Sequence, residues 1–430
     1  MQWDAEDRSA RARHRDAELR RYVAGDLGRF TPFYRRHFAE CRVDPKRVRG
    51  LADLSNVRPI TWDDVRTDPG AFVVQPDRRG LARHGDRRLV MSMLAAWFTR
   101  RFDAVNRSVI EPRYKPVLWI VENGVGIGYT DADLVLLARA GSRVMSLAGL
   151  DRSDVVVGLT EAGPHLAHWQ LVLGARAAGV AAVHLGPRPA ADAVAAAAPS
   201  ALAGSPDALL AALASLAERG LRVEQLRTLL VVGADPDPAV RDALVMTASD
   251  VTDASPSVVA SWAPPGARVQ WGECRDGEGF HTFPDLEVIE VGRGGGLHTS
   301  GPGELIWSAI GWCGTTWLRL LTGSRAEVTD GTCAACRRQG PMVVTGTRSA
   351  LGVLATLRGR DDISAFQVEV GDRDGETELV VFLALARGSD LIDVLDDVDE
   401  SLDATQYVVL SKQQVESRIR RVGSRVSRPS

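Results

Sequence analysis

Residues 155–184 read VVVGLTEAGPHLAHWQLVLGARAAGVAAVH, and this stretch decides the fold. Val155–Leu159 and Val180–His184 are short apolar runs with the length and composition of buried strands. Between them, His165–Ala178 has the length and apolar periodicity of a helix. Strands joined through a helix pair in parallel, so the stretch predicts an α/β fold with a mostly parallel sheet that helices cover on both faces.

The same pattern continues on both sides of this stretch. Val117–Val121 and Thr228–Val232 are further strand-like runs, and Ala132–Ala148 has helical spacing. Residues 189–218 are rich in alanine with apolar helical spacing, which favours packed helices over disordered low-complexity sequence. These segments predict an α/β part over residues 111–260.

The segments before and after this part have a different texture. Residues 1–110 predict a helical entry, with helical spacing over Ala17–Phe30 and Tyr34–Cys41 and an N-cap at Thr61. Residues 261–345 predict a β-rich part with antiparallel strands at Leu286–Val291 and Gly303–Trp307. The glycines at 292–296 between them predict a hairpin turn rather than a phosphate loop, because neither Lys-Ser/Thr nor a helix start follows.

The end of the chain predicts a smaller α+β domain over residues 346–430. Its predicted elements are strands at Phe366–Val370 and Glu378–Leu385, a helix at Asp390–Leu402, and a basic tail from Lys412.

The composition limits the class of protein. With 430 residues, 45% hydrophobic and 25% charged, the chain predicts a globular protein of two or three lobes. A net charge of −3 argues against electrostatic binding of nucleic acid or of an anionic membrane. The charged N-terminus, Asp4–Arg21, is unlike a signal peptide, and no 18-residue apolar run predicts a transmembrane helix. Five cysteines, an odd number, favour a reducing cytoplasm over a disulfide framework.

Two short segments contain the residues of a candidate metal site. GECRDGEGFH (residues 272–281) and TCAACRRQG (residues 332–340) supply Cys274, His281, Cys333 and Cys336. A Cys3His set fills all four positions of tetrahedral zinc, so the metal would be structural. The alternative is buried free cysteines beside an unrelated histidine. Zinc is favoured because three of the five cysteines fall in these two turns. Cys313 lies outside them and is expected to be an inert strand cysteine.

The order of the segments resembles the phenylacetate-CoA ligase branch of the AMP-forming adenylating enzymes, the ANL superfamily. The resemblance spans nearly the whole chain, and its signal is that weak motifs follow one another in the family's order. They are the Phe33–Arg36 and Leu51–Leu54 segments, Tyr129–Leu134, Gly204–Pro206, Gly233–Asp235, Glu273–Cys274 with His281, Gly303–Leu305, Arg319, and Thr322–Gly323. Some members carry a zinc site from this Cys/His pair and a Cys-x-Cys turn, which is one residue longer here.

The resemblance implies a large N-terminal domain over residues 1–345 and a small C-terminal domain over residues 346–430. It also implies a two-step ligase that uses ATP and Mg²⁺ to form an acyl-adenylate and then transfers the acyl group to CoA or a carrier protein. A small carboxylic acid would be the substrate. Relatives often form homodimers, so a homodimer is expected by analogy.

Several nucleotide-binding motifs of the family are altered in this chain. Glu122–Gly128 stands where a Ser/Thr/Gly-rich loop ending in Gly-Lys-Pro would bind phosphates, and it predicts a β-turn; its glycines could alternatively expose N–H groups to an anion. Ser261–Pro265 replaces Tyr-Gly-x-Thr-Glu and has no metal-binding glutamate. Ser324 replaces the ribose-binding aspartate. Arg418 replaces the catalytic lysine, and the hinge aligns best with Gly346–Ala350.

The resemblance places other site residues by position. A nucleotide would contact Gly233, Trp262, Arg319, Thr322 and Ser324. His165 and His168, on one face of the predicted helix, could line a pocket for an aryl or acyl group with Ser205, although such histidines are more often packing residues.

Two functions remain open at this point. The first is a homologue that no longer adenylates and has a binding role, a partner role or altered chemistry. It is favoured because one lost electrostatic contact typically costs about 10²–10³ in rate, and several are changed here. The second is a divergent ligase that activates an aryl or acyl acid with ATP and Mg²⁺ for transfer to CoA or a carrier protein. A serine hydrolase is disfavoured, because the chain has no Gly-x-Ser-x-Gly motif.

Overall fold

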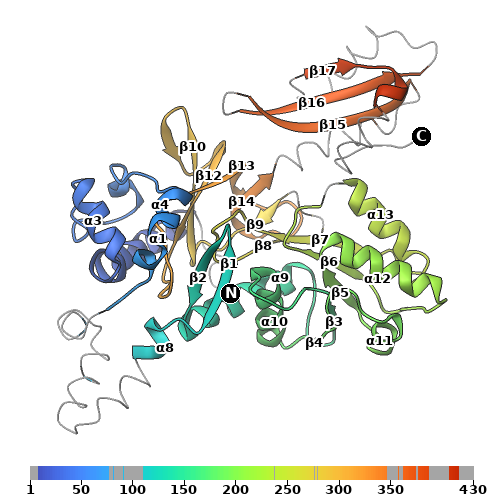
Figure 1. Cartoon of the computed structure of the whole chain (residues 1–430), viewed down its shortest axis with the longest axis horizontal. Coiled ribbons are helices and arrows are strands. Elements are labelled where there is room, and N and C mark those ends of the chain that lie inside the picture. The colour runs from blue at the N-terminus through green and yellow to red at the C-terminus, as the bar shows by residue number, and fades with distance from the viewer. Residues whose placement is uncertain are drawn as a thin grey trace.

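The described part of the chain forms three β-sheets, with helices packed around the largest (Figure 1). The computed structural model describes residues 8–76, 81, 91, 110–236, 238–275, 277, 279–345, 357, 362–373, 376–386 and 406–415. The largest sheet has 12 strands in the order β11-β10-β12-β13-β14-β9-β8-β7-β6-β5-β3-β4. One half of this sheet is parallel and the other antiparallel.

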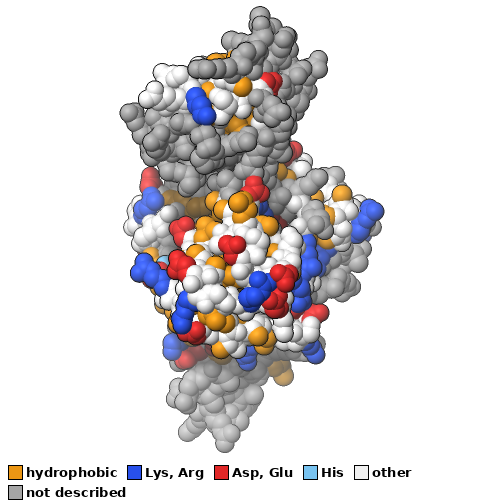
Figure 2. Space-filling view, turned by 90° about the vertical axis from the view of Figure 1, so that its right-hand side faces the viewer, with side chains coloured by type: hydrophobic (Ala, Val, Ile, Leu, Met, Phe, Trp, Pro, Cys, Tyr) orange, Lys and Arg blue, Asp and Glu red, His pale blue; other side chains and the backbone are white. Residues whose placement is uncertain are grey.

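The parallel half confirms the α/β prediction. Its strands, from the edge inward, are β4 (Ala181–His184), β3 (Val155–Gly158), β5 (Ala201–Gly204), β6 (Thr228–Val232) and β7 (Ser257–Trp262). The crossovers contain α10 (Leu166–Ala178), α11 (Ala191–Ala196), α12 (Pro206–Glu218) and α13 (Pro238–Ala248). Every residue of β5 and β6 is buried, so both faces of the sheet are covered. Figure 2 shows the face that carries α11–α13, where acidic and basic side chains are interspersed.

Two details of the α/β prediction were wrong. The strand predicted at Val117–Val121 exists as β1 (Leu118–Glu122), but it pairs only with β2 (Val125–Tyr129) in a separate antiparallel hairpin. The Asn123–Gly124 turn, with φ of 49° and 76°, sends the chain straight back. Residues 189–218 form helices interrupted by β5, whose alanines are too small to distinguish a buried strand from a helix by pattern.

The antiparallel half confirms the predicted strands and the predicted hairpin turn. Gly294 and Gly295, both at positive φ, form a two-residue turn between β10 and the short β11. The strands of this half are β8 (Trp271–Glu273), β9 (Phe280–His281), β10 (Glu287–Arg293), β11 (Gly296–His298), β12 (Gly301–Ala309), β13 (Leu320–Thr332) and β14 (Gln339–Thr345).

The sequence predicted helices in the first part of the chain, and helices before residue 73 are present and lie against this half of the sheet. Thr61 caps its helix in a capping box with Asp64, as expected. The elements are α1 (Arg8–Tyr22), η2 (Val23–Leu27), α2 (Gly28–Phe30), α3 (Pro32–Glu40), η3 (Leu51–Leu54), α4 (Trp62–Thr67) and η4 (Pro69–Phe72), followed later by α8 (Glu111–Tyr114). The helix α9 (Asp131–Leu147) then packs along α10.

The third sheet comes from the end of the chain. β15 (Ile363–Arg373) and β16 (Glu376–Leu385) are antiparallel, and β17 (Gln406–Val409) joins β16 in parallel. Both predicted strands are therefore confirmed, and the helix predicted at Asp390–Leu402 lies outside the described residues. Among the described residues, no helix is both long enough and apolar enough to cross a membrane.

One buried carboxylate joins four separate segments of the large sheet region. Asp133, at the start of α9, accepts hydrogen bonds from the backbone N–H of Cys313 (2.7 Å) and of Gly314 (2.8 Å). It also pairs with Arg268 at 3.1 Å, and both side chains are 0% exposed. The Arg268 guanidinium in turn donates to the Gly128 carbonyl at 3.0 Å. The end of the hairpin, α9, the β7–β8 loop and the β12–β13 loop therefore meet at one ion pair.

Asp133→Asn should lower the free energy of unfolding by about 3–5 kcal/mol, because it leaves the Arg268 charge buried without its partner. Urea denaturation checks this. Asp131→Asn, an exposed first-turn acid on the same helix, is the matched control and should cost less than about 1 kcal/mol. Equal losses in the two variants would contradict the role given to Asp133.

Candidate metal centre and the carboxyl edge of the parallel sheet

The four candidate metal ligands lie together where the two halves of the large sheet meet. Cys274 follows β8, His281 ends β9, and Cys333 and Cys336 form the turn between β13 and β14. One ligand atom from each lies within 4.8 Å of the others. The Sγ atoms of Cys274 and Cys333 are 3.8 Å apart, and Cys336 Sγ is 3.4 Å from His281 Nε2. Tetrahedral zinc would separate two sulfurs by about 3.8 Å and a sulfur from a nitrogen by about 3.6 Å. The donor set and its spacing therefore fit zinc.

The backbone of the Cys333–Cys336 turn favours the thiolate form of Cys333. Burial acts to raise the pKa of the Cys333 thiol, but the backbone N–H groups of Cys336 and Ala335 outweigh it and lower that pKa. Arg337 closes the turn at φ 63°, and the Cys333 N–H donates to the Arg338 carbonyl at 2.9 Å. At Cys274, burial and the neighbouring thiol of Cys336 raise the pKa. A cation among these sulfurs would stabilise their thiolate forms.

A glycine makes room for the cluster. A Cβ atom on Gly277 would lie 2.5 Å from Cys274 Sγ, so only glycine fits at this position. The glycine was visible in the 272–281 segment, but its contact with the sulfur could not be read from spacing. The cluster also connects strands that are paired over a short length, because β9 pairs with β8 and with β14 through two residue pairs each.

Near β9 lies another buried carboxyl group, in addition to that of Asp133. Glu287 of β10 accepts hydrogen bonds from the indole N–H of Trp271 at 2.7 Å and of Trp307 at 2.5 Å, and from the Phe283 backbone N–H at 2.8 Å. Burial raises its pKa to about 7, and these three N–H donors only partly offset that effect. Glu287 therefore links β8, β10 and β12 through the two tryptophans.

Three predicted site residues lie at the carboxyl ends of the parallel strands. Gly233 follows β6 at φ 82° and donates its N–H to the Ser261 carbonyl at 2.8 Å. Trp262 ends β7 and packs edge-on against Trp271, with ring centres 5.8 Å apart. Ser205 follows β5, is exposed, and caps α12. This is the edge at which open α/β sheets bind ligands.

The two predicted histidines also lie at this edge. His168 Nδ1 is 2.9 Å from the Thr160 hydroxyl, and its ring centre is 5.9 Å from that of His184. Burial and the nearby His165 lower the pKa of His168, so its ring is neutral near pH 7. His165 is exposed at the N-cap position of α10. Thr160 and His184 were not predicted, although their places just after β3 and at the end of β4 could have drawn attention to them.

Two of the predicted site residues, Thr322 and Ser324, lie on β13. The Thr322 hydroxyl donates to the Leu305 carbonyl at 2.8 Å and accepts from the Ser324 N–H at 3.1 Å. Further along β13, Ala326 pairs with Thr345, whose hydroxyl contacts Asp235 in the loop after Gly233. That chain of contacts links this part of β13 to the carboxyl edge.

Arg319 has different neighbours. Its guanidinium donates to the Glu290 carboxylate at 2.8 and 2.9 Å and also contacts the carbonyls of Leu54 and Val57. Arg319 is 2% exposed. Its hydrogen bonds connect the N-terminal helical layer to the sheet, and they already occupy the donor groups of its side chain. Arg418 and the predicted hinge at Gly346–Ala350 lie outside the described residues.

The Glu122–Gly128 segment forms the predicted β-turn. Glu122 and Val125 are paired across the Asn123–Gly124 turn, so the loop contains two residues. The Trp119 ring lies against Gly126 and Gly128, and the Gly128 N–H donates to the Thr315 hydroxyl at 2.8 Å. Burial raises the pKa of Glu122, whose carboxylate accepts the Gly266 N–H at 2.9 Å.

Comparison with solved structures identifies known proteins that share this fold. The crystal structure of 2-hydroxyisobutyryl-CoA ligase in the postadenylation state with R3-HIB-AMP matches with a TM-score of 0.62 and 14% identity over 96% of this chain and 92% of that chain. An open conformation of 2-hydroxyisobutyryl-CoA ligase with 2-HIB-AMP and CoA matches with a TM-score of 0.62 and 15% identity over 94% and 88%. The chain therefore has the fold of the AMP-forming acid–CoA ligases, as the sequence resemblance implied.

Sequence comparisons add nothing to this likeness. No protein-family profile matches the chain, and no curated protein matches it. At 14–15% identity, the structural likeness shows the fold, and activity has to be argued from the site.

The raised pKa of Glu287 predicts a pH-dependent stability. The folded protein keeps a proton that the unfolded chain, with a glutamate pKa near 4.5, releases. The free energy of unfolding should therefore fall as pH rises from about 4.5 to about 7, by at most about 1.4 kcal/mol per unit, and then level off. Urea denaturation between about pH 5 and 8 should show this component in the parent and lose it in Glu287→Gln. The exposed Glu327→Gln is the control, and a Glu287→Gln profile parallel to the parent's would refute the assignment.

Proposed function

We propose that this chain is a non-adenylating homologue of the AMP-forming ligases, of their phenylacetate-CoA ligase branch. It would keep the ligase fold and a carboxyl edge able to bind an acid or acyl group, without forming an acyl-adenylate. Its role would be binding, partnership with another protein, or altered chemistry. The cytoplasm is the proposed location.

The observation that carries this proposal is the two-residue turn between β1 and β2. A phosphate loop has to present several backbone N–H groups to the anion from one concave stretch. Here the strands pair up to the turn itself, Trp119 covers two of the glycines, and the Gly128 N–H already bonds Thr315. No hydroxyl or lysine lies in Glu122–Gly128 to replace those contacts.

Two further positions support the same conclusion. Pro264 and Pro265 stand near the place of the metal-binding glutamate, and neither can coordinate Mg²⁺ through its side chain. Ser324 replaces a carboxylate, and its own N–H bonds Thr322. Each substitution removes charge from the place where a triphosphate and its cation would need it.

The carboxyl edge is the proposed binding surface for a small carboxylic acid or for the acyl group of a carrier protein. Neutral His168 with Thr160 offers hydrogen bonds, and exposed Ser205 and His165 lie at neighbouring helix starts. The competing function, a divergent ligase using ATP, Mg²⁺ and CoA, is favoured by Gly233 at this edge and by Thr322 on β13, two residues that the family resemblance assigns to nucleotide binding.

Isothermal titration calorimetry with ATP and Mg²⁺ separates these two functions. We expect no saturable heat at nucleotide concentrations up to about 1 mM, because nothing replaces the lost phosphate contacts. The 2-hydroxyisobutyryl-CoA ligase serves as the positive control. Micromolar binding of ATP by this chain would favour the divergent ligase instead.

We also propose that Cys274, His281, Cys333 and Cys336 hold a structural Zn²⁺. Four protein ligands leave no open position, so the ion would not activate water or substrate. It would instead connect the β8–β9 and β13–β14 loops across the short strand pairings of β9.

Metal analysis of the purified protein should find about one equivalent of zinc. Cys333→Ser should lose the metal and unfold at lower urea, because removing one ligand opens the tetrahedral set. Gly277→Ala should also lose the metal and unfold at lower urea, although it replaces no ligand residue, because its Cβ would clash with Cys274 Sγ. Cys41→Ser is the matched control for Cys333→Ser. Gly331→Ala is the matched control for Gly277→Ala, because a Cβ added at Gly331 meets nothing within 4 Å. Less than about half an equivalent in the parent protein, or unchanged stability of Cys333→Ser, would count against zinc.

A further inference from the structure

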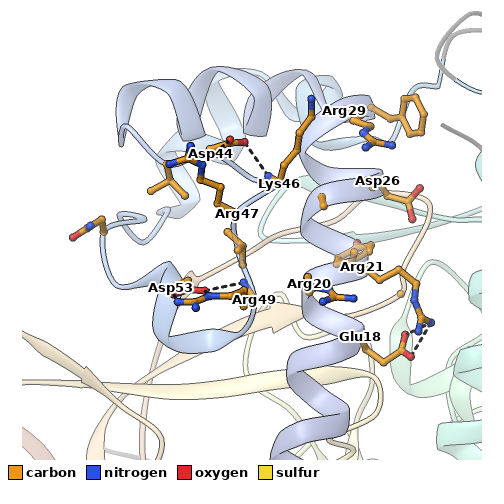
Figure 3. Close-up of a pocket in the computed structure, with 18 of the residues that line it drawn as sticks. Glu18, Arg20, Arg21, Asp26, Arg29, Asp44, Lys46, Arg47, Arg49 and Asp53 are labelled. Carbon is orange, nitrogen blue, oxygen red and sulfur yellow. Dashed lines mark hydrogen bonds and ion pairs between the residues drawn. The ribbon is translucent and has the colours of Figure 1, made fainter. Parts of the chain in front are cut away.

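We infer that a groove in the N-terminal helical layer is a binding site for a small anion that carries two or more phosphate groups. The groove lies between α1 with its continuation η2–α2 on one side and the loop at 42–49 on the other, with α8 at one end (Figure 3). Its volume is about 1360 Å³. The site is separate from the carboxyl edge, so it does not depend on the function proposed above.

The groove concentrates positive charge. Eight cationic and four acidic side chains line it, whereas the whole chain has a net charge of −3. Each acid already has a basic partner in an ion pair. The pairs and their N–O distances are Arg21–Glu18 (2.9 Å), Arg113–Asp26 (3.5 Å), Arg47–Asp44 (3.7 Å) and Arg49–Asp53 (3.1 Å). Four cations are left over.

These four cations are Arg20, Arg29, Arg42 and Lys46. Within the described part of the chain, none of them has a carboxylate at ion-pair distance, although Arg29 also lies in the field of Asp26. Arg20 and Arg29 come from α1 and α2, and Arg42 and Lys46 come from the loop at 42–49, so both sides of the groove contribute cations. The charges on the α11–α13 face are interspersed by contrast (Figure 2).

The backbone at Arg42 is an independent indication that its side chain has a use. Arg42 follows the C-cap residue of α3 and lies in the left-handed region, at φ 55°, where its N–H donates to the Ala39 carbonyl and the N–H of Val43 donates to the Phe38 carbonyl. Glycine is usual at this helix-terminating position, and a residue with a Cβ costs roughly 1 kcal/mol there. An arginine held in this conformation with its guanidinium unpaired suggests selection for binding.

The chemistry favours phosphate over an acidic protein. Arginine guanidinium groups donate two parallel hydrogen bonds to phosphate oxygens, and three of the four free cations are arginines. In a concave site, a small anion can contact both walls at once, whereas a flat acidic surface would reach only the rim. The positive charge of the groove comes from side-chain cations, so binding would weaken with salt.

Calorimetric titration with sodium tripolyphosphate at about 50 mM salt tests the inference. We expect saturable 1:1 binding with a Kd below about 1 mM, which weakens strongly at about 500 mM salt. Arg42→Gly should weaken binding roughly tenfold, because it removes one charged donor. The same variant should be at least as stable as the parent in urea, because glycine suits the left-handed position.

Arg188→Gly is the control, since it removes the same charge from an exposed bend outside the groove. It should leave tripolyphosphate binding unchanged. Absence of saturable binding, or equal weakening by the two variants, would overturn the inference. So would preferential binding of a twelve-residue polyglutamate peptide, which would identify the groove as a surface for an acidic protein.

Discussion

The buried pair of Asp133 and Arg268 is the interaction on which the rest of the structure depends. An unpaired charge at either position would be costly, so the segments that supply hydrogen bonds to the pair are held where they are. Arg268 lies flat against the Tyr129 ring, with its guanidinium carbon 3.9 Å from the ring centre, and near Trp312 at 4.7 Å. These rings and the Gly128 carbonyl fix the base of the β1–β2 hairpin. The turn at the hairpin tip consists of two exposed residues, Asn123 and Gly124.

The shortness of this turn bears directly on the proposed function. A loop that cradles phosphates needs several residues, and this hairpin has only two between its paired strands. The candidate zinc centre lies where the strand pairing of the large sheet is short, because β9 contributes only two residues between the two halves of the sheet. We propose that the chain keeps the fold of a ligase while its nucleotide-binding contacts are reduced. Fold and activity are separable in this way because they depend on different residues.

The sequence predicted the fold well where local pattern and tertiary position agree. Strand–helix–strand periodicity predicted β3, α10 and β4, and ligand spacing predicted four residues that do converge. Pattern failed where context decides. Ala201–Gly204 resembles its helical neighbours in composition, and only burial between helices makes it a strand. Val117–Val121 has the composition of a sheet strand, and the Asn123–Gly124 turn diverts it. The positions of Arg319, engaged by Glu290, and of Thr160 beside His168 depend on contacts between distant segments, which spacing does not encode.

The central claim is that this fold no longer forms acyl-adenylates. ATP–pyrophosphate exchange measures that step directly, because labelled pyrophosphate enters ATP only if an adenylate forms reversibly. With a panel of aryl, hydroxy and short-chain carboxylic acids, the account predicts exchange no greater than without enzyme. Acid-dependent exchange at a rate comparable with that of 2-hydroxyisobutyryl-CoA ligase would contradict it.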